Sequence, residues 1–202
     1  LYRLKYEQPE IFRNVAHVLH LPQYLSWLIS AKLYAELTSI GCHTNLWNFD
    51  EHTYQQWLSD EDVLPLMPEL VSSSLVIPVV YKGKNIAVGI GLHDSSSALI
   101  PYLQKHQTNF MLLSTGTWCI SLNPFNHSPL TQQELKNDCL CFLQSNGNSV
   151  KAARYFGGHI HQELVQHIAA HFPVTIDEIV AYAYTDDEIQ SLKKMYKGND
   201  YL

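Results

Sequence analysis

An acidic residue at a predicted strand-to-helix turn is the first group in this chain that could do chemistry. Residues 86–99 read IAVGIGLHDSSSAL, so apolar residues are followed by glycines, one acid and three serines. This pattern predicts a buried strand that turns into a helix, with Asp94 at the turn. The helix dipole would keep that carboxylate ionised, and an ionised carboxylate can accept a proton from a substrate hydroxyl. Aspartate is also a preferred helix cap, so a purely structural role is the alternative.

A second group of candidates lies in a predicted hairpin. Two short apolar runs, 110–113 and 119–122, read as strands. The segment that joins them contains Ser114, Thr115, Gly116, Thr117 and Trp118. Backbone N–H groups and hydroxyls in such a turn can hold phosphate oxygens. An ordinary turn is the alternative, because glycine and threonine are common in turns.

The two motifs together resemble the FGGY family of carbohydrate kinases. The matching stretches are GLHDSSSALIPYL at 91–103 and FMLLSTGTWCISLNP at 110–124. The resemblance implies an α/β fold of the actin-like ATPase (ribonuclease-H-like) kind, with two domains around an ATP cleft. Residues 1–106 would end the first, sugar-binding domain, and residues 107–202 would begin the second, nucleotide-binding domain.

The resemblance also implies roles for individual residues. Asp94 corresponds to the catalytic base, and His93 lies near the sugar. The phosphates of ATP would be held by Gly116 and Thr117, together with Thr115 and Ser114. The His-Asp pair is most similar to that of the deoxyketose kinases, whose substrates are sugars such as L-rhamnulose and L-fuculose.

The opening of the chain is similar to the same family. Residues 9–50 resemble the helical segment that precedes the catalytic acid in this family. Ala31 stands where the family pattern has a glycine. An N-terminal phosphate and Mg²⁺ turn and a C-terminal adenine site of the family have no counterpart in the sequence. ATP and Mg²⁺ are the expected cofactors, with no metal ligand assigned to this chain. We therefore expect these 202 residues alone to be inactive.

Composition limits the other classes of function. The chain has 202 residues, of which 46% are hydrophobic and 16% charged, so a globular fold is expected. A net charge of −6 without basic runs argues against a nucleic-acid partner. Apolar runs are shorter than the ~20 residues of a spanning helix, which argues against a membrane protein. The four cysteines have no disulfide-framework spacing, so we expect thiols and a cytoplasmic protein. Sugar and ATP are the expected partners, and a homodimer is left open.

Periodicity predicts the elements that must position these residues. We expect helices from Pro9 to Leu19 and from Pro22 to Ile40, a short helix around Trp57, and a helix near residues 98–103. Beyond these, 71–80 reads as extended and 82–85 as a turn. Later helices are expected after Ser149, after Thr175 and over 186–195. Trp47 could stack on a sugar, but a place in the core is the favoured interpretation.

Two other functions remain as alternatives to a kinase. One is a non-catalytic sugar-binding or regulatory module derived from the same fold. The other is a metal-dependent hydrolase, because His167 and His171 lie four residues apart on a predicted helix, with His159 and His161 upstream. Residues 168–170 contain no glutamate of an HExxH motif, so we expect no bound transition metal there.

Overall fold

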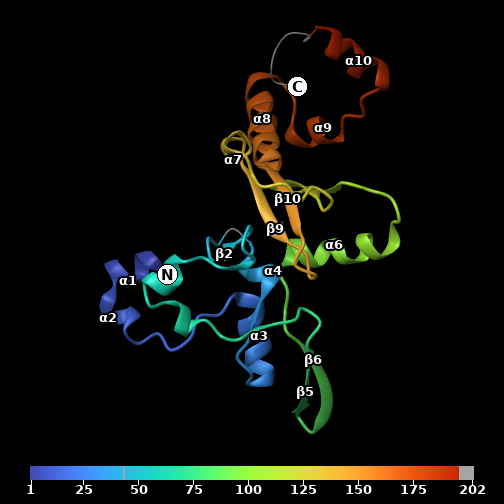
Figure 1. Ribbon diagram of the computed structural model, residues 1–202. Helices are drawn as coiled ribbons and strands as arrows, with labels where there is room; N and C mark the ends of the chain where they lie inside the picture. The colour runs from blue at the N-terminus through green and yellow to red at the C-terminus, as the bar shows by residue number, and fades with distance from the viewer. Residues whose placement is uncertain (43, 196–202) are drawn as a thin grey trace. The chain divides into compact units, whose positions relative to one another are not determined.

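The computed structural model describes residues 1–42 and 44–195, which form two compact units (Figure 1). The larger unit comprises Leu1–Thr115 and Cys119–Tyr155. The smaller unit comprises Gly116–Trp118 and the chain from Phe156 onward. The expected domain boundary between residues 106 and 107 remains a prediction.

Without residue 43, which is not described, the larger unit contains short helices and four separate sheets. Its helices are α1 (Tyr2–Glu7), α2 (Pro9–Phe12), α3 (Leu21–Ser30), α4 (Leu37–Ile40), α5 (Trp57–Asp60), the 3₁₀ helix η1 (Leu64–Leu66), α6 (Asp94–Lys105) and α7 (Gln132–Lys136). Its strands are β1 (Ala35–Glu36), β2 (Trp47–Asn48), β3 (Thr53–Tyr54), β4 (Leu70–Val71), β5 (Val76–Tyr81), β6 (Lys84–Gly89), β7 (Leu112–Ser114), β8 (Cys119–Asn123), β9 (Cys139–Leu143) and β10 (Ser149–Tyr155).

The two long helices expected before residue 41 are shorter in the structure. The first turn of α2 contains Pro9 as predicted, but the helix ends at Phe12. A proline also lies in the first turn of α3, which ends where Ala31 takes a left-handed conformation with φ of 54°. The expectation of a helix up to Ile40 is therefore wrong. Parallel pairing of β1 with β4 interrupts it, since this long-range pairing outweighs the local helical periodicity.

The aromatic region after residue 44 packs as a small core. Trp47 is only 7% exposed, which confirms the core interpretation. Its ring meets the edge of Tyr54, with 5.9 Å between the ring centroids. The short helix expected around Trp57 does not reach back to Tyr54, which lies in β3 opposite Trp47, because α5 begins only at Trp57.

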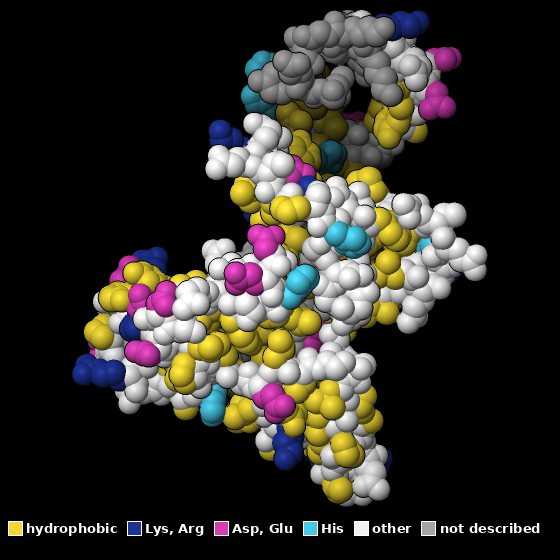
Figure 2. All heavy atoms as spheres, in the orientation of Figure 1, with side chains coloured by type: hydrophobic (Ala, Val, Ile, Leu, Met, Phe, Trp, Pro, Cys, Tyr) yellow, Lys and Arg dark blue, Asp and Glu magenta, His cyan; other side chains and the backbone are white. Residues whose placement is uncertain are grey.

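The strand before Asp94 belongs to an antiparallel hairpin. β5 and β6 pair along their whole length, with the predicted turn at Lys82 and Gly83. The expectation of a buried strand holds only for Val88: the other residues of β6 are exposed, and Ile86 is 37% exposed. Figure 2 shows hydrophobic side chains on the surface of this hairpin.

A four-stranded antiparallel sheet forms the second core of the larger unit. Its strand order is β7, β8, β10, β9, and the predicted hairpin corresponds to β7 and β8. Leu99 of α6 packs in the same cluster as Leu122 and Phe142, so this core also holds the helix that begins at Asp94. The expectation that Ser149 starts a helix is wrong: β10 begins there and pairs with both β8 and β9.

The smaller unit is mainly helical. Its helices are α8 (Gly157–His171), α9 (Ile176–Ala181) and α10 (Asp186–Met195). The predicted helices after Thr175 and over 186–195 are confirmed, the former by a capping box between Thr175 and Glu178. Within the described ranges 1–42 and 44–195, no helix is long and apolar enough to cross a membrane.

Candidate active site

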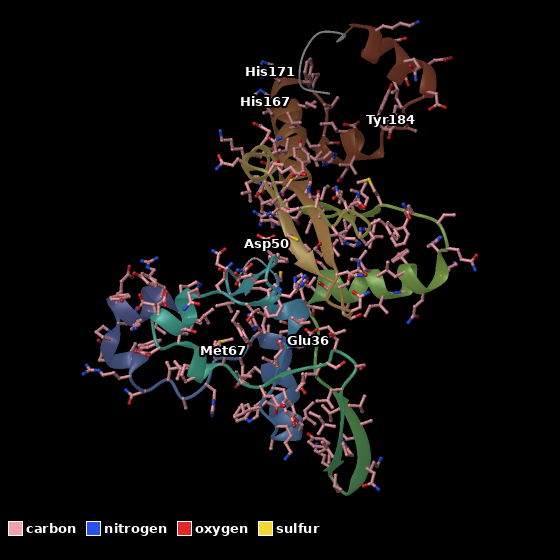
Figure 3. The ribbon with its side chains drawn as sticks, in the orientation of Figure 1. Glu36, Asp50, Met67, His167, His171 and Tyr184 are labelled. Carbon is pink, nitrogen blue, oxygen red and sulfur yellow. The ribbon has the colours of Figure 1, made fainter. Side chains whose placement is uncertain are left out.

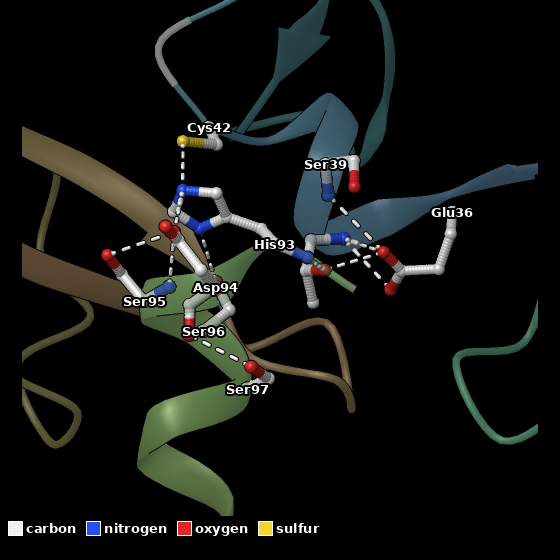
Figure 4. A network of polar contacts seen from close by, with 9 residues as sticks. Glu36, Ser39, Cys42, His93, Asp94, Ser95, Ser96 and Ser97 are labelled. Atoms are coloured by element: carbon white, nitrogen blue, oxygen red, sulfur yellow. Dashed lines mark hydrogen bonds and ion pairs between the residues drawn. The ribbon is translucent and has the colours of Figure 1, made fainter. Parts of the chain in front are cut away.

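The site is built around the start of α6. Asp94 is the first residue of this helix and His93 precedes it as the N-cap, so the predicted place of the acid is confirmed (Figure 4). The Asp94 side chain is 94% exposed. Its Oδ1 accepts the backbone N–H of Ser95 at 2.6 Å. A solvent-facing carboxylate at this position can reach a substrate.

The imidazole of His93 contacts several side chains. Its Nε2 lies 3.1 Å from Oδ1 of Asp94 and 2.9 Å from Sγ of Cys42, and its Nδ1 lies 3.2 Å from Oγ of Ser96. The ring edge packs on Phe142, with 5.3 Å between centroids. Because a carboxylate only accepts hydrogen bonds, we assign the proton of the neutral ring to Nε2, and Nδ1 then accepts the Ser96 hydroxyl.

The Cys42, His93 and Asp94 side chains do not form a nucleophilic triad. In such a triad the nucleophile and the acid bind different nitrogens of the imidazole. Here both approach Nε2, so the ring cannot take the thiol proton while it donates to the acid. The geometry therefore favours a role for the ring in holding the carboxylate.

Burial raises the pKa of the Cys42 thiol to about 12, and the negative charge of Asp94 adds to the increase. A raised pKa leaves almost no thiolate at pH 8, although an imidazole lies alongside. We expect iodoacetamide to modify Cys42 about a hundredfold more slowly than the partly exposed Cys139 in the folded chain. Peptide mass spectrometry over time at pH 8 measures both rates. After unfolding in urea the two cysteines should react at equal rates. Equal rates in the folded protein would contradict a buried, protonated Cys42 thiol.

The loop between β6 and α6 is anchored on α3. The side-chain amide of Gln23 donates to the carbonyl of Gly91 at 2.8 Å, and the Ser26 hydroxyl donates to the carbonyl of Gly89 at 2.8 Å. Gly91 has φ of +83°, and a Cβ there would lie 2.5 Å from the carbonyl oxygen of Pro22. The loop thus needs glycine at this position for both conformation and space.

A second anchor comes from the start of α4 and was not found in the sequence. Glu36, labelled in Figures 3 and 4, caps α4. It is fully buried, and its carboxylate accepts the N–H and hydroxyl of Thr38. The Thr38 hydroxyl oxygen in turn accepts the backbone N–H of His93 at 3.0 Å. The sequence could have indicated this anchor, because Glu36 is the single acid in the otherwise uncharged stretch 33–49 and is followed by Thr38 and Ser39.

The candidate phosphate residues fall in both units. Ser114 ends β7 and Thr115 follows it, in the larger unit. Gly116 and Thr117 belong to the smaller unit, where the N–H of Gly158 donates to the carbonyl of Thr117 at 3.1 Å. All four candidates are exposed. The structure thus brings Asp94 and His93 together in one unit, and Gly116 and Thr117 together in the other.

The approach of α8 to the turn in the smaller unit explains the glycine at position 158. A Cβ on Gly158 would lie 2.4 Å from the carbonyl oxygen of Gly116. Beside this contact, the rings of Trp118 and Phe156 stack with 4.3 Å between centroids. Gly157 and Gly158 are the first two residues of α8.

The histidines of α8 are the candidate metal ligands of the alternative hydrolase function. His167 and His171 lie one turn apart with stacked rings, 5.6 Å between centroids (Figure 3). Among residues 1–42 and 44–195, no group of three or more His, Cys, Asp or Glu side chains is placed to hold a metal ion. The pair therefore offers two ligands, fewer than the three protein ligands of a catalytic zinc site.

Comparison with solved structures shows which class of proteins shares this fold. A carbohydrate kinase from Novosphingobium aromaticivorans matches the structure with a TM-score of 0.70 and 25% identity, over 82% of this chain and 38% of that one. A ligand-bound xylulose kinase from Lactobacillus acidophilus matches with a TM-score of 0.63 and 16% identity, over 78% and 33%. The fold is therefore the α/β, actin-like ATPase fold of these kinases, as predicted.

Sequence comparison adds matches to one family of carbohydrate kinases. Residues 107–191 match the family model for the carbohydrate kinase FGGY C-terminal domain. A rhamnulokinase from Klebsiella pneumoniae is 28% identical over 146 residues, and one from Pectobacterium atrosepticum is 27% identical over 158 residues. These matches cover 65% and 68% of this chain, but 28% and 30% of the relatives. The predicted relationship to the FGGY family of carbohydrate kinases is confirmed, for a chain that spans less than a third of those rhamnulokinases.

Proposed function

We propose that the chain contributes to phosphoryl transfer from ATP to a hydroxyl of a ketose sugar. The observation that carries the proposal is the carboxylate of Asp94, which is exposed at the N-terminus of α6 while its Oδ1 is held by Ser95 and His93. Oδ2 makes no hydrogen bond within the part of the chain that the structure describes. One oxygen is therefore fixed, and the other is available to a substrate hydroxyl.

In this mechanism Asp94 accepts the proton of the sugar hydroxyl as its oxygen bonds to the γ-phosphorus, and the bond from that phosphorus to ADP breaks. His93 lies beside the sugar and holds the carboxylate in place. The phosphates of ATP are held by Gly116 and Thr117, with Ser114 and Thr115. Mg²⁺ would shield phosphate charge, but the described residues offer no ligand cluster for it. No residue of this chain is assigned to the metal.

The proposed substrate class is a deoxyketose such as L-rhamnulose or L-fuculose. Its support is the His93-Asp94 pair and the similarity to proteins named rhamnulokinase. The assay is ADP release by the product of the complete gene with L-rhamnulose, L-fuculose and D-xylulose, with ATP alone as the control. We expect turnover with a deoxyketose and none from the 202-residue chain alone. Saturable binding of ATP and sugar without turnover would instead identify a non-catalytic sugar-binding module.

A further inference from the structure

The buried carboxylate of Glu36 is more than a helix cap. It is fully buried, and a charge taken out of water costs several kcal/mol unless it is well hydrogen-bonded. The carboxylate accepts the backbone N–H groups of Thr38 and Ser39, at 3.0 and 3.3 Å, and the hydroxyls of Thr38 and Ser73. Within residues 1–42 and 44–195 it has no Lys or Arg ion-pair partner. Neutral donors from α4 and from the chain before β5 therefore hold this charge.

The hydroxyl of Thr38 has its direction fixed by this carboxylate. Thr38 is fully buried, and its single hydroxyl proton is donated to Oε2 of Glu36 at 2.5 Å. The lone pairs of the same oxygen must then face away from the carboxylate, because a hydroxyl has one donor and two acceptor positions. One of them accepts the backbone N–H of His93 at 3.0 Å.

The hydrogen bond to His93 fixes the start of α6. The N–H of His93 is bound by Thr38, and its carbonyl accepts the N–H of Ser97 in the first turn of the helix at 2.8 Å. Both ends of this residue are therefore held, one by α4 and one by α6. Asp94 follows directly, so the direction of its Cα–Cβ bond is set by the same contacts.

We propose that Glu36 and Thr38 are positioning residues, which hold the His93 backbone so that the Asp94 carboxylate has one fixed orientation. The part of this inference that concerns turnover rests on the proposed function. Neither residue touches the reacting atoms in this mechanism; both act through His93. Catalysis is sensitive to such placement, since a shift of about 1 Å can cost roughly a hundredfold in rate.

The contact itself is tested without any activity. In the 202-residue chain, amide hydrogen exchange at His93 is measured by NMR for Thr38→Val, Thr38→Ser and Glu36→Gln. Valine keeps the shape of threonine but cannot accept the N–H, so we expect exchange at His93 to become about tenfold faster, while serine stays within about threefold of the original. Glu36→Gln keeps the shape of the side chain and is expected to make exchange at His93 faster, as Thr38→Val does. It serves as a second variant if Thr38→Val does not fold.

The matched control is Thr131→Val. Thr131 also pairs with a glutamate at a helix start, since its hydroxyl accepts the N–H of Glu134 in the capping box of α7. We expect this variant to leave exchange at His93 unchanged. Unchanged exchange in Thr38→Val and Glu36→Gln, or an equal change in Thr131→Val, overturns the proposal.

The positioning role is tested on turnover by the product of the complete gene. We expect Thr38→Val to lower kcat about tenfold or more with the sugar KM within about threefold, and Thr38→Ser to restore kcat. A purely structural role would lower the amount of folded enzyme and leave its kcat unchanged. If Asp94→Asn abolishes turnover and Thr38→Val leaves kcat unchanged, the positioning role is wrong. If Asp94→Asn leaves turnover intact, the proposed function is wrong, and the exchange data still decide whether Thr38 holds His93.

Discussion

Replacement of Asp94 by asparagine is expected to lower sugar-dependent ADP release by roughly 10² to 10⁴-fold in the product of the complete gene. Asparagine has nearly the same shape and can still accept the N–H of Ser95, but it cannot take a proton from the sugar hydroxyl. The loss should therefore appear in kcat, with the sugar KM within about threefold. Steady-state kinetics with a coupled ADP assay measures both constants.

The fold should tolerate this substitution. Asp94 is exposed, and its charge at the N-terminus of α6 is worth about 0.3 to 1 kcal/mol. Urea unfolding of the 202-residue chain should thus show a change of less than about 1 kcal/mol. Asp177→Asn is the matched control, because Asp177 also lies in the first turn of a helix, α9, and should leave turnover unchanged. Near-normal ADP release by Asp94→Asn would remove the assignment of Asp94 as the base.

The second large effect is expected from Gly91→Ala. A left-handed backbone costs a residue with a Cβ about 1 to 2 kcal/mol, and at Gly91 the new Cβ would also lie 2.5 Å from the carbonyl oxygen of Pro22. That neighbour is backbone at the start of α3, so it cannot rotate away as a side chain could. We expect the free energy of unfolding to fall by about 3 kcal/mol or more.

Two other glycines distinguish the two causes of this loss of stability, the left-handed backbone and the contact with Pro22. Gly83 has φ of +75° but nothing within 4 Å of an added Cβ, so Gly83→Ala should cost only the backbone term of about 1 to 2 kcal/mol. Gly89 has neither a positive φ nor a close neighbour, so Gly89→Ala should change stability by less than about 1 kcal/mol. Urea titrations of the three variants give the order directly. Equal stability of Gly91→Ala and Gly89→Ala would mean that the loop moves away from Pro22 without cost.

The predictable parts of the fold were those with strong local signals. The helix that begins at Asp94, the turn at Lys82 and Gly83, and the helix after Thr175 all depend on residues a few positions apart. Capping residues and turn glycines act through their own backbone, so the sequence shows them directly. The failures have the opposite cause. β1 and β10 look helical by periodicity, but β1 pairs with the distant strand β4, and β10 pairs with β8 as well as with its hairpin neighbour β9.

The candidate site divides in the same way. The sequence by itself determined the family motifs, the acid at a strand-to-helix turn with His93 before it, and the Gly116-Thr117 turn, because these are contiguous. Only the tertiary structure showed that Cys42 and Thr38, 51 and 55 residues before His93, contact that histidine. It also showed that Glu36 is buried and accepts the Thr38 hydroxyl. Such contacts depend on which segments meet when α3, α4 and α6 pack, and no spacing along the chain encodes that meeting.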